Sequence, residues 1–138
     1  MLNILIDTDV ILDVYLHRID FFVNSSRVLN SIDKGYYNGF TSSVSIVNAY
    51  YFLKKEYKNQ KAINILKEIR NMITILSVSE KIIGNAINSN FKDFEDAVQY
   101  HCALENNIEC IITRNKKDYS KAQIPVYTPM EFINIITE

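Results

Sequence analysis

The sequence predicts an α/β fold built on a parallel sheet that is covered on both faces. Short apolar runs alternate along the chain with longer segments whose apolar residues recur at helical spacing. Residues 108–113 form a β-branched run interrupted by a single acid, which is typical of a strand buried on both faces. This run follows a segment with helical spacing that begins at Phe94, so strand and helix alternate here too.

The first quarter of the chain contains one strand and two helices. Residues 2–6 form a short apolar strand that runs into Asp7-Thr8-Asp9, and residues 10–16 then form a short helix. The polar residues 24–26 offer N-caps for a second helix. Gly35 ends that helix, because glycine readily adopts the left-handed backbone needed past a helix end.

A second strand and a third helix follow. Residues 36–41 form the strand, and residues 41–43 cap the helix. One face of this helix is predicted to pack in the core through Val44, Val47, Tyr51 and Phe52. Asn48 lies on the turn between them and is therefore predicted to point toward packed surroundings. Further upstream, two aromatic residues are predicted to be core or dimer contacts, namely Phe21 and Phe22.

The rest of the chain continues the alternation of helices and strands. Residues 60–71 form an amphipathic helix and residues 72–78 form a strand, after which a serine-capped helix leads to the acidic segment around Phe94. Residues 124–127 form a short edge strand, where proline is tolerated. Residues 128–129 suit the N-cap and first position of a last helix.

Acidic and amide side chains gather at the carboxyl ends of two strands. If these strands are parallel neighbours, their ends meet at one edge of the sheet and form one cleft. The side chains predicted to meet there are Asp7, Asp96 and either Asp118 or Asn115. Such a cluster repels itself unless a cation neutralises it. Mg²⁺ prefers carboxylate oxygens and keeps waters that can attack a phosphodiester.

Four segments match motifs of a known family in order and spacing, namely residues 4–13, 41–51, 93–103 and 111–119. They resemble the PIN-domain nucleases, and in particular the VapC-type toxins of bacterial toxin–antitoxin pairs. The resemblance implies a three-layer α/β/α sandwich with a central parallel sheet, in a single domain of residues 1–138. It also implies RNA cleavage that depends on Mg²⁺ or Mn²⁺, a homodimer and a cognate antitoxin protein.

The resemblance also assigns roles to residues. Asp7 matches the first metal-binding acid, Asp96 matches the acid that opens the late helix, and Asp118 or Asn115 falls at the fourth acidic position. We therefore take Asp7, Asp96 and Asp118 as the catalytic set, with Asp7 and Asp96 as metal ligands. Secondary candidates are Asn48, Asp93, Glu95, Thr113, Asn115 and Asp9.

Asn48 is a departure from the family pattern, because a glutamate commonly stands at this position. An amide can coordinate through its oxygen but cannot act as a base or supply charge. Either Glu95 or Asp93 would then have to supply the missing charge. The alternative is a catalytically impaired PIN-like domain that acts by binding RNA or a protein.

A second alternative is a phosphatase of the haloacid-dehalogenase type. Asp7-Thr8-Asp9 directly after an apolar strand resembles the nucleophile and acid pair of that class. The chain is short for such an enzyme and has neither an obvious cap nor a clear downstream lysine followed by an acid pair.

Composition limits the possible partners and surroundings. The chain has 138 residues, 48% of them hydrophobic, and a net charge of −1, so it has no global attraction to nucleic acid. Local cations would have to hold an RNA, and the nearest candidates are Arg114, Lys116 and Lys117. We expect a cytoplasmic protein without membrane spans, in which Cys102 and Cys110 are free core residues.

Overall fold

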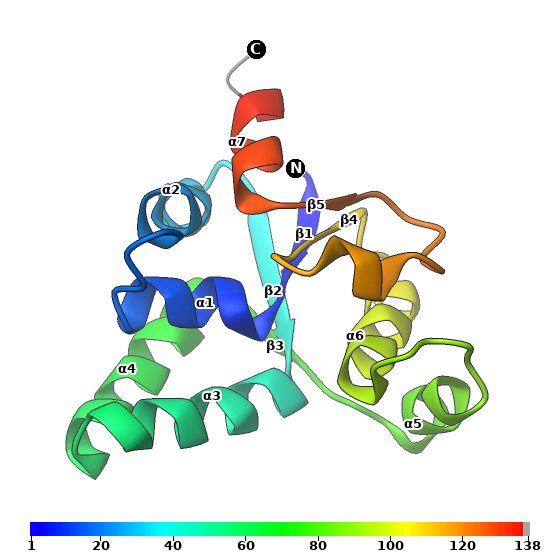
Figure 1. The fold of residues 1–138 in the computed structure, drawn as a ribbon, viewed down its shortest axis with the longest axis horizontal. Coiled ribbons are helices and arrows are strands. Elements are labelled where there is room, and N and C mark those ends of the chain that lie inside the picture. Colours follow the sequence, from blue (N-terminus) through cyan, green and yellow to red (C-terminus); the bar gives the residue numbers. More distant parts are fainter. Residues whose placement is uncertain (137–138) are drawn as a thin grey trace.

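The computed structural model describes residues 1–136 and has a central sheet between two layers of helices (Figure 1). Five parallel strands lie in the order β3-β2-β1-β4-β5. They are β1 (Asn3–Ile6), β2 (Asn38–Ser42), β3 (Thr74–Leu76), β4 (Cys110–Ile112) and β5 (Val126–Tyr127). The predicted α/β/α sandwich is confirmed. The last two residues of the predicted 1–138 domain lie outside the described residues.

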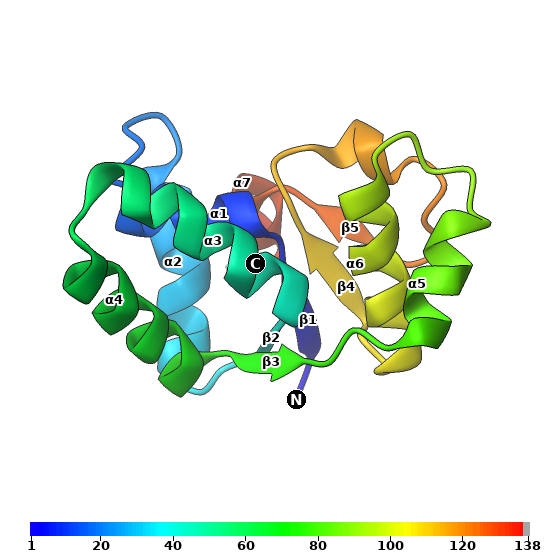
Figure 2. The ribbon, with the colours of Figure 1, turned by 90° about the horizontal axis from the view of Figure 1, so that it is seen from below.

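Helices cover both faces of the sheet (Figure 2). One layer consists of α1 (Thr8–Tyr15), α2 (Phe22–Asp33), α3 (Ser43–Glu56), α4 (Asn59–Met72) and α7 (Pro129–Ile136). The other layer consists of α5 (Glu80–Ile87) and α6 (Phe94–Glu105). A short 3₁₀ helix, η1 (Lys116–Tyr119), follows β4. The layers are therefore unequal, with the larger one on the side of the N-terminal helices.

Two apolar cores lie on the two faces of the sheet, and β1 contributes to both. Ile4 and Ile6 belong to the core under α1, α2, α3, α4 and α7, whereas Leu5 belongs to the core under α5 and α6. Ile112 and Ile111 of β4 divide in the same way. This division follows from the pleat, because successive strand residues point to opposite faces.

Local sequence signals account for several helix ends. Ser42 and Ser79 each accept a hydrogen bond from the backbone N–H three residues later, at the starts of α3 and α5. Thr128 and Glu131 each accept a hydrogen bond from the other's backbone N–H, which fixes the start of α7. Gly35 has a φ of 82° just after α2, as predicted.

The predicted start of α2 is wrong. The helix begins at Phe22, before the polar residues 24–26 that suggested caps. The carbonyl oxygen of Arg18 accepts hydrogen bonds from the N–H groups of Phe21 and Phe22, so a backbone turn leads into the helix without a side-chain cap. Ser25 is instead buried inside the helix.

The predicted inner face of α3 is wrong for Val47, Tyr51 and Phe52, although Val44 does pack against the core under α5 and α6. The buried side chains of this helix are spaced by four residues, namely Ser45, Ala49 and Leu53. The large side chains that suggested the other face are exposed, by 56% for Val47, 62% for Tyr51 and 42% for Phe52. Asn48 is half-buried and is not one of the buried residues of this helix. Small residues allow α3 to pack closely, which a pattern based on large apolar residues overlooks.

The cysteines agree with the prediction from composition. Cys102 and Cys110 are both buried and free. Within residues 1–136, no helix combines the length and the apolar character that crossing a bilayer requires.

Two glycines provide a matched stability test. A Cβ on Gly39 of β2 would lie 2.7 Å from Cδ1 and 2.9 Å from Cγ2 of the buried Ile32, whereas a Cβ on Gly84 within α5 would have no neighbour within 4 Å. We expect Gly39→Ala to lower the free energy of unfolding by about 1–3 kcal/mol through overpacking. We expect Gly84→Ala to raise it by about 0.5–1 kcal/mol, since alanine is the better helix former. Urea unfolding measures both, and an unchanged Gly39→Ala midpoint would contradict the close approach of β2 to α2.

Candidate active site

The pairing of β1 with β4 places Asp7, which follows β1, beside the carboxyl end of β4. The backbone N–H of Asp7 donates to the carbonyl oxygen of Ile112 at 3.0 Å. The hydroxyl of Thr113 donates to Asp7 Oδ2 at 2.7 Å. Asp7 also caps α1, because its Oδ1 accepts a hydrogen bond from the N–H of Thr8 at 2.8 Å. Asp7 is therefore both the N-cap of α1 and a side chain at the edge of the sheet where β1 and β4 end.

Asp96 reaches the same place from α6. Asp93 is the N-cap of this helix and accepts a hydrogen bond from the N–H of Asp96 at 3.0 Å. The hydroxyl of Tyr119, at the end of η1, lies 3.5 Å from Asp7 Oδ2 and 3.2 Å from Asp96 Oδ1. One buried phenol therefore connects the two carboxylates that the sequence predicted to be metal ligands.

These side chains line a cavity of about 230 Å³, which we call the acid cavity. Its lining consists of Asp7, Thr8, Asp9, Phe52, Asp93, Glu95, Asp96, Asn115 and Asp118. Six of these residues carry carboxylates. No basic residue of the described chain lines the cavity. A larger cavity of about 490 Å³ lies between α1, α2 and α4, but its lining contains none of the predicted site residues.

The acids of the cavity are in an unfavourable electrostatic environment. Burial and the nearby charges of Asp9 and Glu95 raise the pKa of Asp7 to about 6, although the hydrogen bond from Thr113 opposes this change. Burial and the charge of Asp7 raise the pKa of Asp96 to about 8. Burial, together with these carboxylates, also raises the pKa of the Tyr119 hydroxyl well above its usual value.

One polar atom of the cavity has no partner. The hydroxyl of Thr8 is buried and makes no hydrogen bond within residues 1–136. A buried hydroxyl without a partner is costly, so such groups usually meet water or a ligand. Thr8 is therefore a further candidate for contact with a bound group.

The structure brings most of the predicted site residues together, but two of them do not line the cavity. Thr113 lies behind Asp7 and orients it through the hydrogen bond described above. Asn48 is absent from the lining, and Phe52, one turn further along α3, takes part in it instead. Asn115 donates a hydrogen bond from its amide to Asp9 Oδ2 at 3.3 Å, so both residues belong to the rim.

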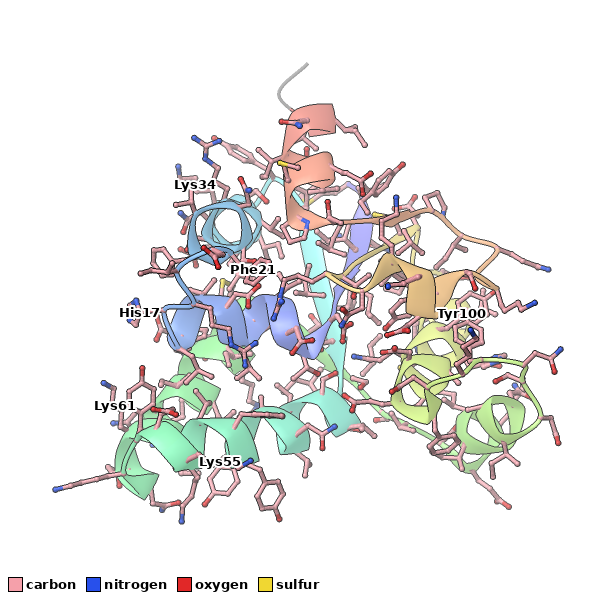
Figure 3. All side chains as sticks on the ribbon, in the orientation of Figure 1. His17, Phe21, Lys34, Lys55, Lys61 and Tyr100 are labelled. Carbon is pink, nitrogen blue, oxygen red and sulfur yellow. The ribbon has the colours of Figure 1, made fainter. Side chains whose placement is uncertain are left out.

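The predicted RNA contacts have unequal surroundings. Arg114 forms an ion pair at 3.0 Å with Asp13, a fully buried acid of α1. Lys116 forms an ion pair at 3.1 Å with Glu131, and Lys117 is exposed. Lys61 is remote from the acid cavity, since Figure 3 places it at the outer end of the α3–α4 pair, on the opposite side from α6.

Sequence reasoning missed Tyr119, Thr8 and Phe52. Tyr119 is 2% exposed although it lies in a polar stretch, and an aromatic residue in such a stretch was the available signal. The hydroxyl of Thr8 was overlooked because its neighbours carry the charge. Phe52 was assigned to the core because of the wrong helix face.

The donor set suits a hard divalent cation. Mg²⁺ is commonly bound by one or two carboxylates, with waters and substrate phosphate completing its octahedron. Asp7 and Asp96 supply two such groups, and burial together with neighbouring acids raises the pKa of both. Within residues 1–136, no three His, Cys, Asp or Glu side chains form a ready-made metal cage. The fit is therefore to an open site that retains waters.

Comparison with known proteins identifies the family. The family model described as PIN domain matches residues 3–117. Ribonuclease VapC1 of Aquifex aeolicus is 31% identical over 135 residues, which cover 94% of this chain and 92% of that protein.

Solved structures share the fold. A toxin–antitoxin complex from Klebsiella pneumoniae gives a TM-score of 0.68 at 23% identity, covering 91% of this chain and 96% of that chain. A DNA-bound VapBC from Salmonella typhimurium gives a TM-score of 0.70 at 11% identity, covering 94% and 99%. At these identities the likeness concerns the fold. From the family model and the VapC1 relative together, we conclude that the chain belongs to the PIN-domain family.

Proposed function

We propose that this protein is a divalent-metal-dependent endoribonuclease and the toxin of a toxin–antitoxin pair. The observation that carries the proposal is the pair of buried acids, Asp7 and Asp96, joined through Tyr119 in a cavity without cations among the described residues. The relative VapC1, a ribonuclease by name, supports RNA as the substrate.

Asp7 and Asp96 would hold Mg²⁺ or Mn²⁺. When bound, such an ion supplies positive charge to a phosphate oxygen and makes an attacking water more acidic. Thr113 keeps Asp7 in place through its 2.7 Å hydrogen bond, and Tyr119 does the same for Asp96 at 3.2 Å. The unpartnered Thr8 hydroxyl can donate to a phosphate oxygen or to water. Asp118 or Glu95, which also line the cavity, can accept a proton from water.

Partners are also part of the proposal. Several solved structures with the same fold are toxin–antitoxin complexes, which supports a cognate antitoxin for this chain. The exposed apolar side chains of α3, namely Val47, Tyr51 and Phe52, supply a surface for a homodimer or for the antitoxin. Light scattering of the purified chain, alone and with the protein encoded beside it, tests both partners.

Cleavage of RNA is the direct test. We expect the wild-type protein to cut structured RNA with Mg²⁺ or Mn²⁺ and to stop when EDTA is added. Asp7→Asn and Asp96→Asn should each lower the rate at least about 100-fold, since even changes around metal ligands cost about 10- to 100-fold. Asp33→Asn, which removes an exposed acid of α2 outside the acid cavity, should leave the rate unchanged.

The same experiment separates the alternatives. Equal cleavage by the wild type and both site variants would contradict the assignment of Asp7 and Asp96. RNA binding without cleavage in either metal would support the impaired domain suggested by Asn48. Turnover of a small phosphomonoester with an aspartyl-phosphate on Asp7 would support the phosphatase alternative.

The raised pKa values predict a pH-dependent stability in EDTA. An acid whose pKa is higher in the folded than in the unfolded protein destabilises the fold above its folded pKa, and this effect disappears below its unfolded pKa. Asp96, with a pKa of about 8 against an ordinary value of 3.8, therefore predicts a loss of stability as pH rises through this window. We expect Tm to fall by about 5 °C or more between pH 5 and pH 8, since each 1 kcal/mol moves Tm by a few degrees.

Two comparisons assign this pH effect to the site. Asp96→Asn should flatten the decline of Tm, whereas Asp33→Asn should keep it. Mg²⁺ at pH 8 should raise the Tm of the wild-type protein but not that of Asp7→Asn, because a ligand stabilises only the state that binds it. Parallel pH curves for the wild type and Asp96→Asn would argue against a buried, uncompensated carboxylate.

A further inference from the structure

A second cavity, of about 260 Å³, has no part in the chemistry described above. It lies between the start of α2, the second residue after β4 and the start of α7. Its lining consists of Asp20, Phe21, Asn24, Ser25, Arg114, Thr128, Pro129 and Met130. We call it the Arg114 pocket.

A flat cation and a flat ring form one wall of this pocket. The guanidinium carbon of Arg114 lies 3.9 Å from the ring centroid of Phe21. Phe21 is 40% exposed, so of the two predicted roles, core residue or dimer contact, the first is wrong. Figure 3 places it by the loop between α1 and α2, toward the centre of the molecule. The pair therefore places a guanidinium over an aromatic ring that is partly open to solvent.

A buried acid holds Arg114 in this position. Asp13 is fully buried and forms ion pairs with Arg114 Nε at 3.0 Å and with Arg18 Nη1 at 3.4 Å. The hydroxyl of Ser25 donates to Asp13 Oδ2 at 3.0 Å. This ion pair restricts the position of the Arg114 side chain, although its buried Nε makes no hydrogen bond within residues 1–136.

Residues next to Arg114 in the chain connect the pocket with the acid cavity, although the two cavities have no lining residue in common. Thr113 and Asn115, on either side of Arg114, serve the acid cavity, the first by bonding Asp7 and the second by lining it. Arg18 also forms an ion pair at 3.5 Å with Asp9 of the acid cavity. A strand with a phosphate over the acids would therefore pass the pocket with a neighbouring nucleotide.

The chemistry of the pocket suits a base better than a phosphate. Planar aromatic and guanidinium groups stack with unpaired bases, which proteins read along their hydrogen-bonding edges. The edge groups here include the acceptor Asp20 and the neutral side chains Asn24 and Thr128. A carboxylate repels a phosphate but accepts hydrogen bonds from the N–H groups of a base.

We propose that the Arg114 pocket binds one unpaired nucleobase of the RNA, next to the phosphodiester over the acid cavity. The proposal rests on the proposed ribonuclease function and adds to it a site that selects the nucleotide. Asp13 is the positioning residue of this site, because it acts through Arg114.

Binding without cleavage tests the pocket. The probe is a labelled single-stranded RNA oligonucleotide, compared with a set in which one base at a time is replaced by an abasic ribose. Fluorescence anisotropy in EDTA at low salt measures affinity, because phosphate contacts weaken as salt rises. The proteins are the wild type, Phe21→Leu, Arg114→Lys and the control Tyr36→Leu, which changes an exposed aromatic residue elsewhere.

The proposal predicts coupling between Phe21 and one base. Phe21→Leu should weaken binding of intact RNA about tenfold, in the range found when a stacking aromatic is removed. Removal of the base at one position should lower the RNA affinity of the wild type by a similar factor and should not lower the affinity of Phe21→Leu any further. In Arg114→Lys, removal of that base should likewise no longer change the RNA affinity. The affinity should still fall as salt rises, since lysine keeps the positive charge. Tyr36→Leu should behave as the wild type.

Other results would overturn the proposal. The first such result is that each abasic position lowers the RNA affinity of the wild type and of Phe21→Leu by the same factor. The second is that no RNA binds. Unchanged RNA binding by Phe21→Leu, with weaker binding of the antitoxin, would assign the pocket to a protein partner instead. If Phe21→Leu melts early, Arg114→Lys supplies the same comparison. Coupling without cleavage by the wild type would refute the ribonuclease function alone, and cleavage without coupling would refute the pocket alone.

Discussion

The parallel pairing of β1 with β4 is the constraint on which the site depends. It joins the backbone of Asp7 to Ile112 and places the side chain of Asp7 against Thr113. Alternate strand residues point to opposite faces, so a slip of one residue would exchange the two faces of β1. Apolar residues on both faces of β1 therefore fix the register, and with it the direction in which Asp7 points.

The chain buries carboxylates in two different ways. Asp13 receives two arginines and a serine hydroxyl, and these partners lower its pKa, although burial still holds that pKa above its ordinary value. Asp7 and Asp96 accept hydrogen bonds only from hydroxyl and backbone groups. Burial and the charges of Asp9 and Glu95 raise the pKa of Asp7, and burial and the charge of Asp7 raise the pKa of Asp96. Burial of unpaired charge is costly. The first arrangement contains cations from the chain itself. The second has none among the described lining residues, so a bound cation or a proton must offset its charge.

The sequence predicted the strand ends better than it predicted the helix faces. Asp7 and Asp96 were found because acids at a strand end and in a first helical turn follow directly from local patterns. Tyr119 was not found, because its role depends on how η1 folds back toward α6. The inner face of α3 was wrong because small residues, Ser45 and Ala49, decide the packing there. Contacts between distant segments, such as Arg114 with Phe21, leave no periodic signal in the chain.

The full burial of Asp13 has a consequence for how this protein can diverge. Replacing Arg114 leaves an acid in the interior with less compensation, so drift at that position is penalised by the fold. Phe21, Asn24 and Met130 are at least partly exposed, and changes there cost the core little. Under the proposed function, descendants of this chain can therefore acquire new nucleotide preferences through the variable wall while the place of cutting, set by the sheet, stays inherited.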